Sequence, residues 1–153
     1  MERRDNAFVG NTRIDRLAAW LVYKAQDGAT LPRWILRIFF RVEFMVGSRV
    51  GPGLKLLHAG TGHLVHSNVV IGSDVVLGPY VAIGAKNDLR AERTNGRVII
   101  SDHVIIAAGA VITLRSDYEL RIGEGTIVGA NSVLTQSTGD WEVWVGVPAR
   151  KLK

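Results

Sequence analysis

Val69-Val70-Ile71-Gly72-Ser73-Asp74-Val75-Val76-Leu77-Gly78-Pro79-Tyr80-Val81-Ala82-Ile83-Gly84 is the stretch that decides the fold of this chain. An aliphatic residue followed by glycine recurs in it at Ile71, Leu77 and Ile83, which is a period of six. An amphipathic helix would repeat about every 3.6 residues and a half-buried strand every second residue. A period of six indicates instead a short strand, a turn and a next strand rotated by a third of a circle.

The same rhythm continues on both sides of this stretch. Aliphatic residues keep the register at Val50, Leu56, Val65, Ile100, Ile106, Ile112, Ile122, Val128 and Leu134. We expect one aliphatic side chain per strand to point inward and to stack on its equivalent in the next coil. Glycine, aspartate and asparagine recur between these positions, and they tolerate the positive φ angles of tight turns. The pattern therefore predicts a mainly β fold of stacked three-sided coils.

Composition and charge narrow the classes of function. The chain has 153 residues, 47% apolar and 22% charged, as in an ordinary globular protein. It has no cysteine, which excludes disulfides, a thiol nucleophile and a cysteine-based metal site. The net charge of +5 comes without a nucleic-acid-binding motif, so we expect it to meet the phosphates of a small cofactor. Because the first residues do not read as a secretory signal, we expect a cytoplasmic protein.

Residues 1–45 do not follow the repeat and are predicted to form an N-terminal helical region. Asn11 or Thr12 would cap a helix that runs to about Gln26, and a second helix would begin at Pro32. The predicted buried face of the first helix is Ile14, Leu17, Ala18, Leu21 and Val22, and the second carries Arg33, Arg37 and Arg41 on one stripe. The apolar run is far shorter than the ~20 residues of a membrane span. We expect these helices to cap residues 46–153, with contact to an anionic membrane surface as the alternative.

One histidine stands out among the four. His58 is followed by Ala59-Gly60-Thr61-Gly62, a run that interrupts the six-residue rhythm. Acyl transfer to a hydroxyl without a covalent intermediate needs a general base, and histidine has a suitable pKa for that role. We interpret His66 and His103 as residues of the wall and of a turn. His58 and His63 also suggest a zinc site, but such a site needs three or four ligands.

These features resemble the hexapeptide-repeat acyltransferases, in particular the serine acetyltransferase branch and its exopolysaccharide (colanic-acid) O-acetyltransferase relatives. The resemblance covers residues 42–153 and includes the terminal Gly146-Val147-Pro148-Ala149-Arg150. It implies a left-handed parallel β-helix with a short N-terminal helical cap, assembled as a homotrimer. It also implies acetyl-CoA as co-substrate, bound between neighbouring subunits.

The resemblance further implies the residues of the site. His58 matches the family's catalytic histidine and would act as general base in a direct transfer. Glu43, fifteen positions earlier, stands where the family has the aspartate that orients this histidine. No metal is expected. The positions that match the family's acetyl-CoA contacts are Gly84, Ala85, Ala108, Ala130, Arg150 and Lys151.

Two departures bear on the acceptor. Serine acetyltransferases carry aspartate directly before the catalytic histidine, where this chain has Leu57. They also carry a second histidine in a loop that corresponds to residues 85–97, and this loop contains no histidine here. We therefore expect O-acetylation of a carbohydrate or polysaccharide precursor, whose hydroxyls are neutral. The alternatives are serine or a similar small amino acid and, more remotely, a zinc-dependent hydratase of the same fold. The four extra residues in the segment 114–121 are expected to form a surface bulge.

Overall fold

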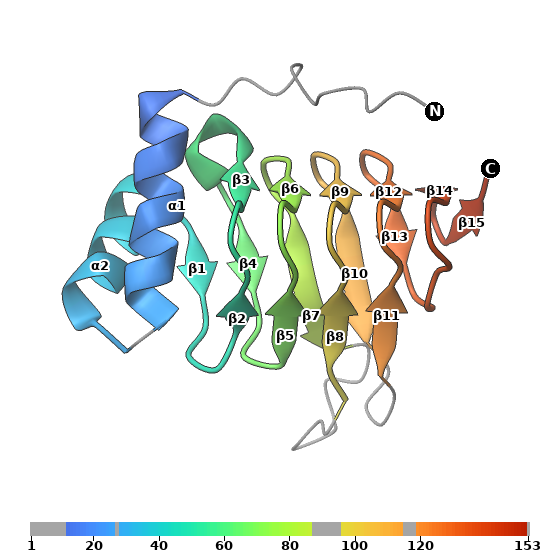
Figure 1. The fold of residues 1–153 in the computed structure, drawn as a ribbon, viewed down its shortest axis with the longest axis horizontal. Helices are drawn as coiled ribbons and strands as arrows, with labels where there is room; N and C mark the ends of the chain where they lie inside the picture. The colour runs from blue at the N-terminus through green and yellow to red at the C-terminus, as the bar shows by residue number, and fades with distance from the viewer. Residues whose placement is uncertain (1–11, 27, 87–95, 115–118, 153) are drawn as a thin grey trace.

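A computed structural model describes residues 12–26, 28–86, 96–114 and 119–152. Helices close one end of a stack of coils, and the chain ends at the opposite end of the stack (Figure 1). The helical part comprises α1 (Arg13–Gln26), α2 (Thr30–Ile35) and η1 (Leu36–Phe40), a π-helical turn that continues α2. A short 3-10 segment, η2 (Leu57–Gly60), follows the third strand.

In the described residues, fifteen strands form three sheets, which we call sheets I, II and III. Sheet I contains β1 (Glu43–Phe44), β4 (Leu64–Val65), β7 (Ala82–Lys86), β10 (Val111–Leu114) and β13 (Val133–Leu134). Sheet II contains β2 (Arg49–Val50), β5 (Val69–Ile71), β8 (Val98–Ile100) and β11 (Leu120–Ile122). Sheet III contains β3 (Lys55–Leu56), β6 (Val76–Leu77), β9 (Ile105–Ile106), β12 (Ile127–Val128), β14 (Val143–Gly146) and β15 (Ala149–Lys151).

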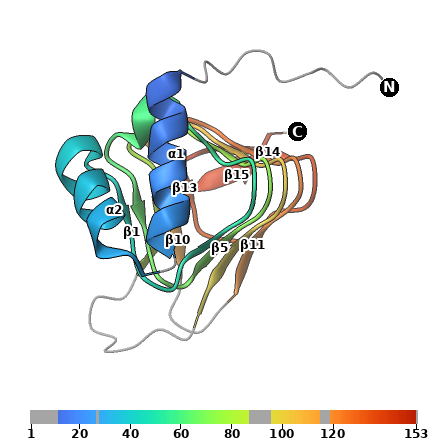
Figure 2. The ribbon, with the colours of Figure 1, turned by 60° about the vertical axis from the view of Figure 1, so that its left-hand side comes forward.

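Consecutive strands of the coils belong to different sheets, so the chain winds around three sides (Figure 2). The pairings within the sheets are parallel except for that of β14 with β15, which ends the stack. The predicted left-handed parallel β-helix with a short helical cap is confirmed. Its first strand, β1, begins at Glu43, slightly before the predicted start at residue 46.

The core is a set of aliphatic columns. In sheet III the strand register places Leu56, Leu77, Ile106 and Val128 directly over one another, and all four are fully buried. Trp144 continues this column in β14 and closes the end of the core. The four aliphatic residues of this column follow the six-residue period, so their inward orientation is the one that the repeat predicts, whereas Trp144 lies outside the period.

The three sheets form the three sides of the stack, and tight turns connect each sheet to the next. We call the line of turns that connects sheet III to sheet I the III–I edge, and name the I–II and II–III edges in the same way. Asp74 and His103 on the II–III edge and Tyr80 and Asn131 on the III–I edge adopt positive φ angles, as expected for such turns. At Gly78 the reason for glycine is space, because a Cβ there would lie 2.5 Å from the backbone nitrogen of Ala108 in the next coil.

α1 begins with a reciprocal cap. The Thr12 hydroxyl accepts the Asp15 N–H at 3.1 Å, and the Asp15 carboxylate accepts the Thr12 N–H at 2.9 Å. The predicted helix is therefore confirmed, and Ala18, Leu21 and Val22 are buried as expected. Ile14 and Leu17, however, are 59% and 49% exposed, so their predicted burial is wrong.

Polar anchors explain this difference in helix rotation. The Tyr23 hydroxyl donates to the Gly51 carbonyl and accepts the Leu54 N–H, each at 2.9 Å. The Gln26 side chain accepts the Val50 N–H at 2.7 Å. These contacts turn the alanines of α1 toward the first coil and leave Ile14 and Leu17 outside, which the apolar pattern alone did not predict.

The second helical segment also differs in detail from the prediction. It begins at Thr30 rather than at Pro32, and η1 ends where Arg41 adopts a left-handed conformation with φ 53°. Arg33 and Arg37 remain one turn apart, whereas Arg41 leaves the helix, so the predicted three-residue stripe is interrupted. Within the described residues, no helix is long and apolar enough to cross a membrane. The predicted loop 85–97 and the bulge within 114–121 lie largely outside the described residues.

Candidate active site

His58 lies on the III–I edge, in the turn that leads from β3 to β4. The turn is unusual because His58 (φ 53°, ψ 43°) and Ala59 (φ 56°, ψ 21°) are both left-handed. Each non-glycine residue in this region costs on the order of 1–3 kcal/mol, so surrounding contacts must hold it in place. The His58 carbonyl accepts the Thr61 N–H at 3.2 Å and the Thr61 hydroxyl at 2.8 Å. The turn leaves the imidazole exposed to solvent on a fixed backbone.

A buried carboxylate from the helical cap holds the same turn. Oδ1 of Asp15 accepts the Ala59 N–H at 2.6 Å, across 44 residues of sequence, and the Asp15 residue is only 5% exposed. Burial opposes ionisation of this carboxyl group. The N–H groups of Ala59 and Thr12, the Thr12 hydroxyl and the nearby His58 outweigh that effect and lower the pKa of Asp15. The negative charge beside His58 therefore comes from α1.

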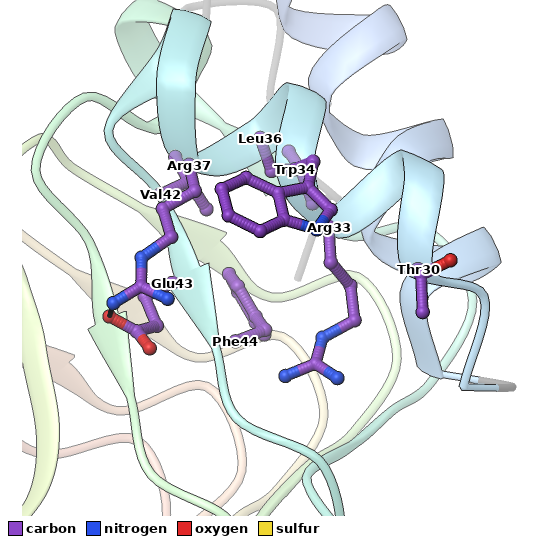
Figure 3. Close-up of a pocket in the computed structure, with 8 residues that line it drawn as sticks. All are labelled: Thr30, Arg33, Trp34, Leu36, Arg37, Val42, Glu43 and Phe44. Atoms are coloured by element: carbon purple, nitrogen blue, oxygen red, sulfur yellow. Dashed lines mark ion pairs between the residues drawn. The ribbon is translucent and has the colours of Figure 1, made fainter.

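Glu43, the predicted partner of His58, has a different contact. It belongs to β1, and its carboxylate lies 3.8 Å from Nη2 of Arg37 in η1 (Figure 3). Among the described residues, no hydrogen bond or ion pair joins Glu43 to His58. The Thr12-x-x-Asp15 pattern identifies a helix cap in the sequence, but nothing in that pattern places Asp15 next to His58. Asp15 is thus the carboxylate that contacts the His58 turn, and the sequence analysis missed it.

His63 lies inside the coil, behind the turn that carries His58. It is 2% exposed, its Nδ1 is hydrogen-bonded to the Gly60 carbonyl, and its Nε2 has no partner in the described part of the chain. Burial lowers the pKa of His63 to about 4, against the opposing effect of the Gly60 carbonyl. His63 points inward while His58 is exposed, and the described residues contain no cluster of three potential metal ligands.

Two of the predicted cofactor-binding residues lie in line with His58. Ala108 and Ala130 are exposed on the III–I edge in the coils that follow. Backbone hydrogen bonds connect the turns of this edge from coil to coil. The Tyr80 N–H donates to the Thr61 carbonyl at 2.8 Å. The Gly109 N–H donates to the Pro79 carbonyl and the Asn131 N–H to the Ala108 carbonyl, both at 2.9 Å. The edge therefore forms a continuous line of turns that leads from His58, past the exposed Tyr80, to Ala108 and Ala130.

The other predicted cofactor-binding residues lie elsewhere on this single chain. Gly84 and Ala85 are at the end of β7, on the opposite border of sheet I, where a Cβ on Gly84 would lie 2.8 Å from Cβ of His66. Arg150 and Lys151 are in β15, at the far end of the stack. Lys151 forms an ion pair with Glu142 at 2.8 Å, and this pair, the Trp144 indole N–H and the Gly139 N–H lower the pKa of Glu142 to about 2.

Comparison by sequence and comparison by structure both match serine acetyltransferases. Serine acetyltransferase from Staphylococcus aureus is 31% identical over 119 residues, which are 78% of this chain and 52% of that protein. The structure of soybean serine acetyltransferase complexed with serine matches with a TM-score of 0.62 and 28% identity, over 91% of this chain and 54% of that one. The structure of Neisseria gonorrhoeae serine acetyltransferase in complex with serine gives a TM-score of 0.65 and 26% identity, over 90% of this chain and 53% of that one.

These comparisons confirm the predicted resemblance to serine acetyltransferases and to their hexapeptide-repeat fold. They give no support to the narrower resemblance to exopolysaccharide O-acetyltransferases. The chain matches no protein-family model. It spans about half the length of the curated relatives that it matches.

The buried His63 generates a prediction about pH. Between pH 6.5 and about 4 the unfolded chain binds a proton at His63 that the folded chain does not. The free energy of unfolding should therefore fall by roughly 3 kcal/mol as the pH decreases through this window. Denaturant unfolding of the wild type and His63→Gln at several pH values measures this loss, which the variant should lack. A difference between the two proteins that does not change with pH would contradict the prediction.

Proposed function

We propose that this chain is an acetyl-CoA-dependent O-acetyltransferase with His58 as the general base. The observation that carries the proposal is the exposed imidazole on a left-handed turn that a buried carboxylate fixes, at the start of the III–I edge. The similarity to serine acetyltransferases supports the same reaction class. A homotrimer, with Arg150 and Lys151 near the phosphates of CoA, remains a prediction of the family resemblance.

The proposed reaction is a direct transfer. His58 takes the proton of the acceptor hydroxyl while the hydroxyl oxygen attacks the thioester carbonyl of acetyl-CoA. The tetrahedral intermediate collapses, the bond between carbon and sulfur breaks, and the CoA thiolate receives the proton from His58. Products are the acetyl ester and free CoA. The adjacent Asp15 carboxylate would stabilise the imidazolium formed in the first step.

The comparisons change the expected acceptor. The sequence analysis favoured a carbohydrate hydroxyl, but the relatives support its alternative, serine or a similar small amino acid. We therefore propose serine as the first candidate. A glycan precursor remains the second candidate because of Leu57, which stands directly before His58 and offers no charge to an ammonium group.

The role of His58 is tested with His58→Asn. Asparagine tolerates the left-handed conformation, so the variant removes the base and keeps the turn. Turnover should fall by a factor of ~10²–10⁴ with acetyl-CoA binding retained. CoA release and calorimetry measure the two quantities. His103→Asn is the matched control, since His103 is also exposed and left-handed (φ 59°) but lies on the II–III edge. Turnover within severalfold of wild type in His58→Asn would remove His58 from the mechanism.

The carboxylate that acts on His58 is identified by comparing Asp15→Asn with Glu43→Gln. Loss of the negative charge that stabilises the imidazolium should lower kcat by a factor of ~10 or more, with the KM for acetyl-CoA unchanged. We expect this loss in Asp15→Asn, where the remaining oxygen can still accept the Ala59 N–H, and not in Glu43→Gln. The reverse result would assign the orienting role to Glu43, as the family resemblance implies.

The acceptor is tested by CoA release with serine, with sugars and with nucleotide sugars as separate substrates. If serine is the acceptor, its kcat/KM exceeds that of every sugar, and serine protects against thermal unfolding in the presence of CoA. A glycan preference combined with no response to serine would support the second candidate instead. Leu57→Asp gives a second comparison, because a carboxylate at this position should raise kcat/KM for serine and not for a neutral sugar.

A further inference from the structure

The helical cap exposes an unusual number of large apolar side chains. Phe39 is 77% exposed and Trp34 is 61% exposed, although both belong to regular helical segments. The buried residues of α1 and η1 belong to the core, whereas these side chains lie on the surface of the cap. We call them, with the cations around them, the cap face. Its apolar members are Ile14, Leu17, Trp20, Leu31, Trp34, Ile38 and Phe39.

Among the described residues, the charges on the cap face are mainly positive. Its cations are Arg13, Arg16, Lys24, Arg33, Arg37 and Arg41. Lys24 lies over the ring of Trp20, 5.9 Å from its centroid, so cation and aromatic groups are interleaved. Within the described part of residues 12–44 there are two carboxylates. Asp15 is buried against the first coil, and Glu43 is partly exposed and paired with Arg37, so cations outnumber carboxylates on this part of the described surface.

A pocket lies at the border of the cap face. Thr30, Arg33, Trp34 and Arg37 line it from the helices, and Phe44 and Glu43, the partner of Arg37, line it from β1 (Figure 3). Arg33 and Arg37 extend along its two sides, with the Trp34 indole between them. Guanidinium groups bind phosphate oxygens through paired N–H donors, and a neighbouring indole supplies an apolar wall. The pocket thus suits a phosphate group that is attached to an apolar body.

We propose that the cap face binds the surface of an anionic phospholipid bilayer. Exposed tryptophans and arginines are typical of the interface between headgroups and acyl chains, where apolar side chains enter and cations remain at the phosphates. A second copy of the chain would bring these cations against like charges, which costs free energy. A polyanion without an apolar region would leave Leu31, Ile38 and Phe39 in water. The helices would lie in the plane of the interface, consistent with their short length.

Vesicle co-sedimentation of the full chain tests the proposal. Wild type should bind phosphatidylcholine vesicles that contain phosphatidylglycerol, more tightly at low salt, and should bind pure phosphatidylcholine much less. Arg33→Gln with Arg37→Gln should weaken binding to the anionic vesicles by a factor of about thirty. Trp34→Ser with Phe39→Ser should weaken it as well, without loss of folding, because both side chains are exposed.

Matched control variants distinguish binding through the cap face from a general effect of removing charged or apolar side chains. Arg97→Gln with Arg121→Gln removes the same charge beside Glu119 and should leave vesicle binding unchanged. Trp141→Ser with Leu152→Ser removes two exposed apolar groups at the far end of the stack and should also have no effect. Equal binding of wild type and Arg33→Gln/Arg37→Gln would overturn the proposal. The proposal would also be overturned if the wild type did not bind vesicles and Trp34→Ser/Phe39→Ser had a lower light-scattering mass than the wild type. That result would assign the cap face to contact with a second copy of the chain.

Discussion

The structure depends on the register between successive coils. Parallel backbone hydrogen bonds and one inward aliphatic column on each side fix every coil on its neighbour, as in Leu56, Leu77 and Ile106 of sheet III. A shift of one residue in any strand would turn its inward side chain to the surface. Because the sides are locked in this way, the turns at the three edges are also aligned, and each edge becomes a straight line of equivalent positions.

The candidate site uses this alignment and departs from it at one point. Ala108 and Ala130 occupy regular turns of the III–I edge, whereas the first turn of that edge is longer and contains His58 and Ala59 in left-handed conformation. The longer turn has no preceding coil to support it. Asp15 supplies the support from α1, so the helical cap closes the β-helix and also fixes the backbone of the proposed catalytic residue.

The helical cap consequently has two different surfaces. Its inner surface is built of small side chains and polar anchors, such as Ala18, Tyr23 and Gln26, that fit the first coil. Its outer surface carries exposed aromatic and basic residues that the described part of the fold does not cover. The His58 turn follows β3 of the first coil and contacts α1, so the proposed chemistry and the proposed membrane contact lie at the same end of the molecule.

The sequence alone determined the β-helix, because a six-residue period admits few other backbones, and it indicated His58 as the candidate base, because the small-residue run interrupts that period. The positions of Ala108 and Ala130 on one edge follow from the same period. Only the tertiary structure decided the rotation of α1, the exposure of Ile14 and Leu17, and the contact between Asp15 and Ala59. These depend on hydrogen bonds between groups 24 to 44 residues apart, and local sequence patterns do not specify which distant backbone group a side chain will meet.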